Sequence, residues 1–171
     1  VKDPRFLENF RSGAPSDFVA EFVRENQKKV MVPGVDVMPP EMYGSGFWEE
    51  YDARCIACGR CNTSCITCTC FSVLDLFYSD SRSCGERRRV WDGCLLDGFT
   101  DMAGGHSFRK GRGERMRFKT FHKIYDFRKR FGFNMCVGCG RCDDVCPEYI
   151  SFSGCISRLA GILGEGGGRN A

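Results

Sequence analysis

Apolar residues recur at helical spacing in three parts of this chain. Residues 17–29 predict an amphipathic helix, for which Ser16 is a suitable N-cap. Residues 117–130 place three aromatic side chains on one face and predict a second helix. The third part predicts a short closing helix, whose apolar positions are Ile156, Leu159, Ile162 and Leu163.

Stretches rich in proline and glycine separate these predicted helices. Residues 33–46 hold three prolines and three glycines and predict an extended linker, and residues 98–113 predict a loop. Because the chain begins at valine, we expect residues 1–46 to be an N-terminal segment and linker that ends a longer upstream region. We expect one domain over residues 47–163 and a disordered, glycine-rich tail over residues 164–171.

The composition is that of a folded domain. Of the 171 residues, 42% are hydrophobic and 27% are charged, so the chain has enough apolar surface for a core. No stretch reaches the roughly 18 uninterrupted apolar residues of a membrane helix, and no secretory leader is recognisable. We therefore expect no membrane partner.

The cysteines change this picture most. There are 13, and the odd count argues against a fully paired disulfide scaffold. Eight form two runs with the spacing C-x2-C-x2-C-x3-C, and the residue after the second run is proline. The runs are Cys55, Cys58, Cys61 and Cys65, and Cys136, Cys139, Cys142 and Cys146. The segments CIACGRCNTSCI and CVGCGRCDDVCP are identical at six of twelve positions, which makes them an internal repeat.

This spacing is typical of iron–sulfur proteins. A [4Fe–4S] cluster needs four soft thiolate ligands, and three cysteines at steps of three converge from one tight loop. In two-cluster ferredoxins the fourth cysteine of each run ligates the other cluster. The predicted ligands are therefore Cys55, Cys58, Cys61 and Cys146 for one cluster, and Cys136, Cys139, Cys142 and Cys65 for the other.

The loops around these cysteines lead to two further expectations. We expect Gly59, Gly138 and Gly140 to adopt positive φ angles, which leave backbone amides free to bond cluster sulfurs. Ile66 stands where the second run has Pro147, so the first run departs from the usual pattern at its fourth ligand. The nearest substitute for Cys65 is Cys68, three residues further on.

Zinc is the alternative metal for these cysteines. Structural zinc sites also use C-x2-C pairs, and the corresponding function is a structural zinc module that binds nucleic acid. Here each run has three closely spaced thiols and a fourth, twice over, which favours iron and sulfide. No recognition fold accompanies the basic residues, so we expect no nucleic-acid partner.

Five cysteines are left over, and we expect most of them to pack as small apolar residues. They are Cys68, Cys70, Cys84, Cys94 and Cys155. A further metal held by Cys84 and Cys94 is the alternative, because these two flank the segment ERRRVWDG. No nucleophile–base pair is recognisable in the sequence, so we expect no catalytic residue.

The segment from Arg109 to Arg130 carries ten Lys or Arg residues and only two acids. It is either a solvated helix face, a docking face for an acidic partner, or charge balance for the clusters. Each oxidised cluster with its four thiolates carries about −2, so two of them would change the formal net charge of +3 to about −1.

Several stretches together closely resemble the ferredoxin-like iron–sulfur subunit of anaerobic sulfite reductase. They are RCIACGRCNTSC, TCTCF, ERRRVWDGC, DGFTDMAGGHSFR, HKIYDFRKRFG and MCVGCGRCDDVCPEYISF. The resemblance covers residues 51–159, and the β subunits of sulfhydrogenases carry related blocks. Together with the 70 residues between the runs, it implies a mainly α fold: an α-helical ferredoxin with two crossed [4Fe–4S] clusters and long loops. It also implies that the chain is the C-terminal portion of such a protein.

The resemblance implies a cytoplasmic, non-catalytic electron-transfer subunit of an oxidoreductase complex. In that family the iron–sulfur subunit relays electrons from a flavin-containing, NAD(P)H-oxidising partner to a sirohaem catalytic subunit, which reduces sulfite to sulfide. Only the eight run cysteines carry over as site residues. The rival interpretation is the equivalent iron–sulfur β subunit of a sulfhydrogenase or of another flavin-linked reductase.

Overall fold

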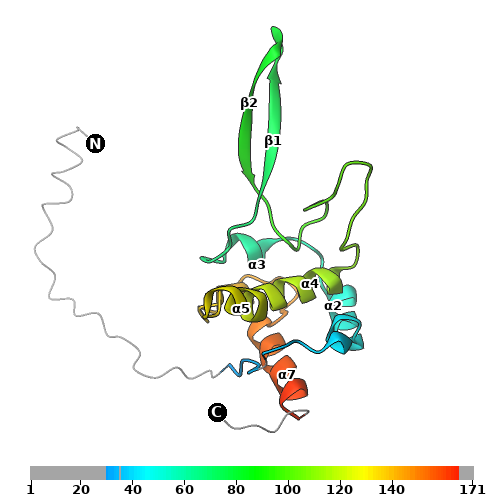
Figure 1. The fold of residues 1–171 in the computed structure, drawn as a ribbon, viewed down its shortest axis with the longest axis vertical. Helices are drawn as coiled ribbons and strands as arrows, with labels where there is room; N and C mark the ends of the chain where they lie inside the picture. Colours follow the sequence, from blue (N-terminus) through cyan, green and yellow to red (C-terminus); the bar gives the residue numbers. More distant parts are fainter. Residues whose placement is uncertain (1–29, 35, 166–171) are drawn as a thin grey trace, which may run out of the picture.

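The computed structural model describes residues 30–34 and 36–165, as a helical body from which one β-hairpin projects (Figure 1). The helix predicted over residues 17–29 lies outside the described residues, as do residues 166–171 of the predicted tail. None of the helices in the described part is long and apolar enough to cross a membrane.

Short helices at the start of the described chain pack onto the body. They are the 3-10 helices η1 (Pro40–Tyr43) and η2 (Gly46–Trp48), followed by α2 (Glu49–Arg54). Proline suits the first position of η1 because it has no amide hydrogen that would be left without a partner. Met42 and Trp48 are buried, and the Trp48 indole donates a hydrogen bond of 2.7 Å to the carbonyl oxygen of Met42. The end of the segment expected to be a linker therefore contributes to the core.

The hairpin follows the first cysteine run and was not predicted. After α3 (Arg60–Thr63), strand β1 (Phe71–Tyr78) pairs antiparallel with β2 (Ser81–Trp91), from Phe71 opposite Trp91 to a two-residue turn. Phe, Val, Leu and Tyr in β1, followed by the polar pair Ser-Asp, are the signal that favours it. Arg87 and Asp75 form an ion pair across the strands.

Most apolar side chains of this hairpin are exposed to solvent. They are Phe71, Val73, Leu74, Phe77, Tyr78, Val90 and Trp91. A two-stranded hairpin alone is marginally stable in water, because neither face is covered. The base of the hairpin, by contrast, is held where residues 92–96 return to the body, and Gly93, Cys94 and Leu95 are buried there. This return anchors the hairpin beside the first cysteine run.

A long helical run crosses the body and confirms the helix predicted over residues 117–130. It consists of α4 (Arg112–Phe121), one π-helical turn η3 (His122–Asp126) and α5 (Phe127–Phe131). The second cysteine run leads through α6 (Arg141–Asp144) into α7 (Phe152–Glu165), which is the predicted closing helix. Gly132 ends α5 with a φ of 83°, a left-handed conformation that favours glycine.

One apolar core joins these helices. Its most deeply buried side chains come from α2, α4, η3 and α7 and are Tyr51, Met116, Phe121, Ile124, Cys155, Ile156 and Leu159. Cysteines of both runs pack against the same core. The fold is therefore mostly helical, as expected, with one small two-stranded sheet that the expectation lacked.

Candidate metal centres

The two cysteine runs follow the same backbone path. In each loop a glycine with a left-handed φ precedes a single helical turn: Gly59 (71°) before α3 and Gly140 (74°) before α6. The carbonyl oxygen of Gly59 accepts the amide of Asn62 at 2.8 Å, and that of Gly140 accepts the amide of Asp143 at 2.9 Å. The sequence repeat is thus also a structural repeat.

Positive φ angles occur at a second matching position of each loop. Gly138 has a φ of 68°, and Ala57, its equivalent in the first loop, has a φ of 56°. The prediction of positive φ at Gly59, Gly138 and Gly140 is confirmed. At Ala57 this conformation turns the backbone amide toward the Cys55 Sγ, 3.4 Å away. Amides directed at sulfur are the donors that a cluster-binding loop needs.

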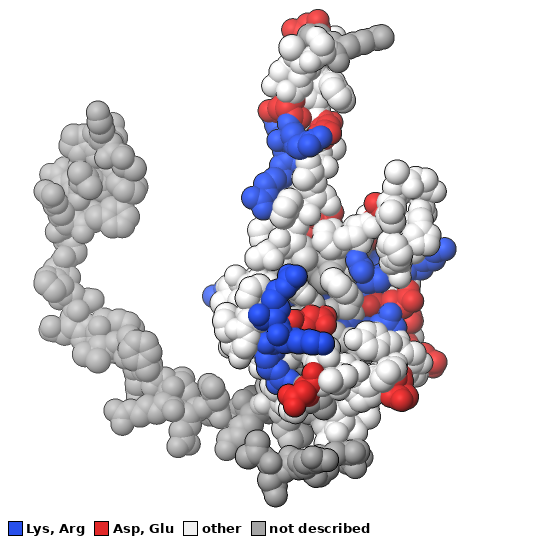
Figure 2. Space-filling view, viewed as in Figure 1, with Lys and Arg blue, Asp and Glu red and all other residues white. Residues whose placement is uncertain are grey.

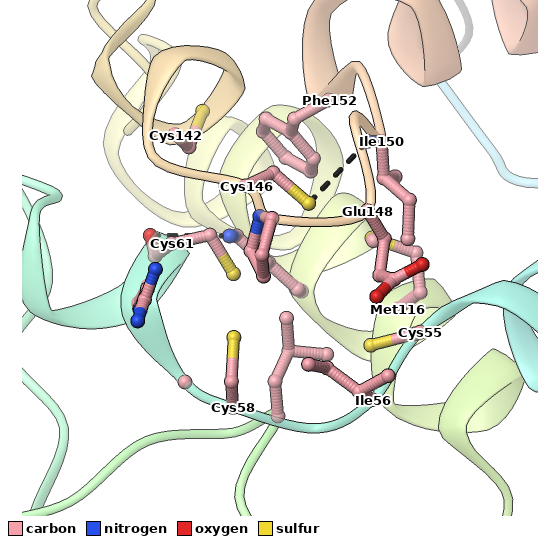
Figure 3. A pocket seen from close by; sticks show the side chains of 15 residues that line it. Cys55, Ile56, Cys58, Cys61, Met116, Cys142, Cys146, Glu148, Ile150 and Phe152 are labelled. Carbon is pink, nitrogen blue, oxygen red and sulfur yellow. Dashed lines mark hydrogen bonds between the residues drawn. The ribbon is translucent and has the colours of Figure 1, made fainter.

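Thiols of both runs line a first cavity. Its walls include Cys55, Cys58 and Cys61 from the first run, and Cys142 and Cys146 from the second. In Figure 3 the sulfurs of Cys55, Cys58, Cys61 and Cys146 lie around the cavity, whereas that of Cys142 points away from its centre. The amide of Ile150 donates to the Cys146 Sγ at 3.3 Å and holds it in place.

A second cavity lies beside the first, and thiols of both runs line it as well. These thiols belong to Cys61, Cys65, Cys136, Cys139 and Cys142. Cys68, the substitute considered for Cys65, does not line this cavity. Burial alone would raise the pKa of Cys65, but hydrogen bonds with Thr67 and the charge of Lys123 lower it below the ordinary thiol value. The Cys65 side chain is therefore suited to be a thiolate.

The residues around both cavities fit iron–sulfur clusters. All 13 cysteines are free thiols, so the ligands are available. Apolar side chains such as Leu95, Met116, Ile150 and Phe152 complete the first cavity. Soft thiolate ligands in an apolar shell are the environment that iron–sulfur clusters require.

Comparison with known protein families agrees with this chemistry. Residues 54–150, more than half of the chain, match the family model described as a 4Fe-4S dicluster domain. The chain belongs to this family. It therefore binds two [4Fe–4S] clusters, and the expected cofactors are confirmed. No solved structure matches the chain.

The chain is also similar to a curated protein over part of its length. It is 40% identical over 108 residues to the protein named sulfhydrogenase 2 subunit beta of Pyrococcus furiosus. The match covers 63% of this chain but only 31% of the relative, so the chain spans about a third of the relative's length. The similarity to sulfhydrogenase β subunits that the sequence indicates is thereby confirmed.

Two lysines of the basic segment point into the protein instead of into solvent. Lys119 is 2% exposed and lines both cavities, and Lys123 is 5% exposed and lines the second. Burial alone would lower the pKa of Lys119, but the neighbouring thiols of Cys61 and Cys142 raise it. For these two residues the charge-balance interpretation of the segment is favoured over that of a solvated face.

The remaining cations of this segment have other positions. Arg115 is also buried and pairs with Asp97, whereas Lys110, Lys129 and Arg130 are exposed. Figure 2 shows Lys and Arg side chains gathered on the body near α5 and along the hairpin. Some cations of this segment are therefore buried in the body, and others are exposed to solvent.

The π-helical turn also positions the second run. The carbonyl oxygen of Lys123, within this turn, accepts the amides of Met135 at 2.9 Å and Cys136 at 3.3 Å. A π turn changes the helical hydrogen-bond pattern locally and is frequent at functional sites. This contact was not predicted, because nothing in the sequence marks the π turn.

Three of the five remaining cysteines lie together near α3. The side-chain amide of Asn62 donates a hydrogen bond to the Cys94 Sγ at 3.2 Å, and its nitrogen lies 4.0 Å from the Cys68 Sγ. Hydrogen bonding to the Cys70 thiol, and to a lesser extent to Asn62, lowers the pKa of Cys94 to about 7. Among the described residues, no three His, Cys, Asp or Glu side chains are arranged to hold a single metal ion.

The other two remaining cysteines lie apart from the cavities. Cys155 is buried in α7 and belongs to the core, as expected. Cys84 is exposed on β2, far along the hairpin from the buried Cys94. The alternative that Cys84 and Cys94 share a metal is wrong, because the hairpin separates them.

Proposed function

We propose that this chain is the electron-transfer part of an iron–sulfur subunit in a flavin-linked oxidoreductase complex. The observation that carries the proposal is the pair of adjoining thiol-lined cavities, whose shared wall consists of Cys61, Lys119, Cys142 and Phe152. Two redox groups separated by one layer of side chains are suited to pass electrons. The clusters supply one-electron oxidation and reduction.

The ligand assignment that we propose is crossed between the runs. Cys55, Cys58 and Cys61 would hold one cluster together with Cys146, which lines the first cavity. Cys136, Cys139 and Cys142 would hold the other together with Cys65, which lines the second cavity. Crossing ties the first run to the second, so cluster binding contributes to the stability of the whole body.

The rest of the chain keeps the redox groups positioned and shielded. The left-handed Gly59 and Gly140 bring the loop backbone to the cavities, and apolar side chains form much of the first cavity's wall. Asp143 accepts the amides of Phe152 and Ser153 at 2.6 and 3.3 Å, which fixes α7 against the second run. No described residue is assigned a role in substrate chemistry.

We propose that the complex is of the sulfhydrogenase type, with this chain in its β subunit. The 40% identity to the sulfhydrogenase 2 subunit beta supports this choice. In this proposal the redox partners are a flavin-containing, NAD(P)H-linked protein and a nickel-containing hydrogenase. The second candidate is the iron–sulfur subunit of an anaerobic sulfite reductase, with a sirohaem partner, which the blocks ERRRVWDGC and DGFTDMAGGHSFR favour.

Anaerobic purification of the tagged full protein from its native source tests both candidates. Mass spectrometry identifies the co-purified subunits, and nickel analysis and the sirohaem absorption spectrum identify their cofactors. Nickel with a hydrogenase subunit supports the first candidate, and sirohaem supports the second. A complex with neither cofactor would rule out both.

A separate experiment tests electron transfer itself. The reconstituted protein is reduced by its flavin partner and NAD(P)H while the visible absorption of the clusters is followed. Bleaching of the clusters on addition of NAD(P)H supports the proposal. A tagged Cys58→Ser, Cys139→Ser double variant provides the control, because it removes one predicted ligand from each cavity. A complex that reduces its terminal substrate equally well with this control would contradict the proposal.

A further inference from the structure

Lys119 and Lys123 are two buried cations on one side of the long helical run. They lie one helical turn apart, Lys119 in α4 and Lys123 in η3. The Lys119 Nζ lies 3.3 Å from the carbonyl oxygen of Cys61 and 4.8 Å from the centre of the Phe152 ring. The Lys123 Nζ donates to the Thr67 hydroxyl at 3.1 Å. Within the described residues, neither lysine forms an ion pair with Asp or Glu.

A buried ammonium group is costly unless a negative charge compensates it. The compensating charge available here is that of the clusters, about −2 each with their thiolates when oxidised. Lys119 lines both cavities and so faces both charges. Lys123 lines only the second cavity. The two lysines are thus distributed unequally between the cavities.

Other charged residues do not cancel this difference. Arg60 and Glu148 line the first cavity, but both are exposed and of opposite sign. Water and salt screen exposed charges far more than buried ones. In the part of the chain that the structure describes, no other charged side chain lines the second cavity. The half-buried carboxylate of Asp143 lies 3.7 Å from the Cys142 Sγ, but it already accepts hydrogen bonds from the amide of Phe152 and from the hydroxyls of Ser151 and Ser153. In buried cations, the first cavity therefore has one and the second has two.

We propose that Lys119 and Lys123 set the reduction potentials of the two clusters, and that Lys123 makes the cluster of the second cavity the easier one to reduce. Each electron added makes a cluster more negative, and a nearby buried cation stabilises the reduced form more than the oxidised form. Because the second cavity has one more buried lysine than the first, electron movement from the first cavity toward the second is favoured. This inference rests on the proposed pair of clusters in the two cavities.

The experiment uses the full chain, reconstituted anaerobically with iron and sulfide. The variants are Lys119→Met and Lys123→Met, because methionine retains the unbranched apolar stem and removes only the charge. The control is Lys129→Met, which removes an exposed lysine from the same helical run. Redox titration with dithionite, monitored by electron paramagnetic resonance, gives the midpoint potential of each cluster.

The expected shifts differ between the variants. Lys119→Met makes both midpoint potentials more negative. Lys123→Met makes only the higher of the two more negative, by at least a tenfold change in the reduction equilibrium, which is about 59 mV for one electron. Lys129→Met changes neither. Equal shifts of both midpoints in Lys123→Met, a shift of only the lower one, or no shift would overturn the proposal.

Iron and sulfide content is measured first, in every sample. A wild-type chain that takes up fewer irons than two [4Fe–4S] clusters contain contradicts the proposed cluster arrangement. A fully loaded set of variants with unchanged potentials contradicts the lysine proposal alone. If Lys119→Met loads poorly, Lys119→Arg and Lys119→Gln are compared. Charge compensation requires that arginine loads better than glutamine, and equal loading of these two would contradict it.

Discussion

The first and second cysteine loops share a sequence pattern and a backbone path, yet their surroundings differ. At Gly59 an added Cβ would lie 2.6 Å from the Leu96 side chain, whereas at Gly140 it would meet no atom within 4 Å. The first loop lies against residues that return from the hairpin, and the second lies more open to solvent. The spacing of the cysteines is therefore sufficient to form the same loop twice. Packing against the rest of the fold then gives the two loops different surroundings.

The residues after the third cysteines show the same divergence. The Cys61 thiol points to the Asn62 side chain at 3.6 Å, and the Cys142 thiol points to Asp143 at 3.7 Å. Asn62 is buried and contacts the segment at the base of the hairpin, including Cys94. Asp143 instead bonds the first residues of α7. Equivalent positions thus connect the two loops to different parts of the fold.

The largest expected effect comes from removing the fourth cysteine of either run. Cys146→Ser should abolish the same electron paramagnetic resonance signal as Cys55→Ser, because both residues line the first cavity. Cys65→Ser should abolish the other signal, which Cys136→Ser also abolishes. Each variant should lose about half of the iron, one cluster of two.

The matched control for these variants is Cys84→Ser, since Cys84 is exposed on the hairpin. It should retain both signals and all the iron. If Cys146→Ser removed the signal that Cys136→Ser removes, each run would hold its own cluster, and the crossed assignment would be wrong.

The next largest effect should separate the two glycines before α3 and α6. Gly140→Ala should lower the free energy of unfolding by about 1–2 kcal/mol, because its φ is left-handed. Gly59→Ala should cost about 1–3 kcal/mol more, because the new Cβ also overlaps Leu96. Anaerobic guanidinium titrations, followed by cluster absorbance, measure both changes. Equal midpoints for the two variants would show that Leu96 moves aside without cost.

A smaller effect, of opposite sign, is expected at Ala57. This residue has a φ of 56° where the second loop has glycine. Ala57→Gly should therefore increase stability by about 1 kcal/mol, since glycine adopts this conformation without a steric cost. The reciprocal change, Gly138→Ala, should decrease it by a similar amount. The same titrations measure both changes. A lower stability of Ala57→Gly would mean that the conformational entropy that glycine adds to the unfolded chain outweighs the strain that it relieves at position 57.

The smallest effect is expected where the two runs differ most visibly in sequence. Ile66 is 58% exposed, so its side chain contributes little to packing. Ile66→Pro, which gives the first run the ending of the second, should change stability by only about 0.5 kcal/mol. It should leave the iron content and both resonance signals unchanged. Loss of the signal that Cys65→Ser removes would show that the departure at Ile66 is structurally required.

The sequence predicted those parts of the fold whose signals are local. Helical periodicity found the run through Phe121 and Tyr125 and the closing helix through Leu159, because each buries one stripe of side chains. The hairpin has no buried stripe of this kind, because its apolar residues are exposed on both faces and β2 is rich in charge. Its local signal is limited to the apolar residues of β1 and the Ser-Asp pair that follows them. Its strands are determined by pairing with each other, which depends on contacts that periodicity does not report.

By itself, the sequence determined the chemistry: spaced cysteines supply eight thiols, and glycines between them permit the tight loops that a cluster needs. Only the tertiary structure decided which thiols share a cavity, because Cys65 and Cys146 meet the opposite run through folding over 70 intervening residues. It also decided that Lys119 and Lys123, two of ten cations in one segment, face the cavities. The sequence does not show which charged side chains face the interior, because that depends on which side of the helix is buried by packing.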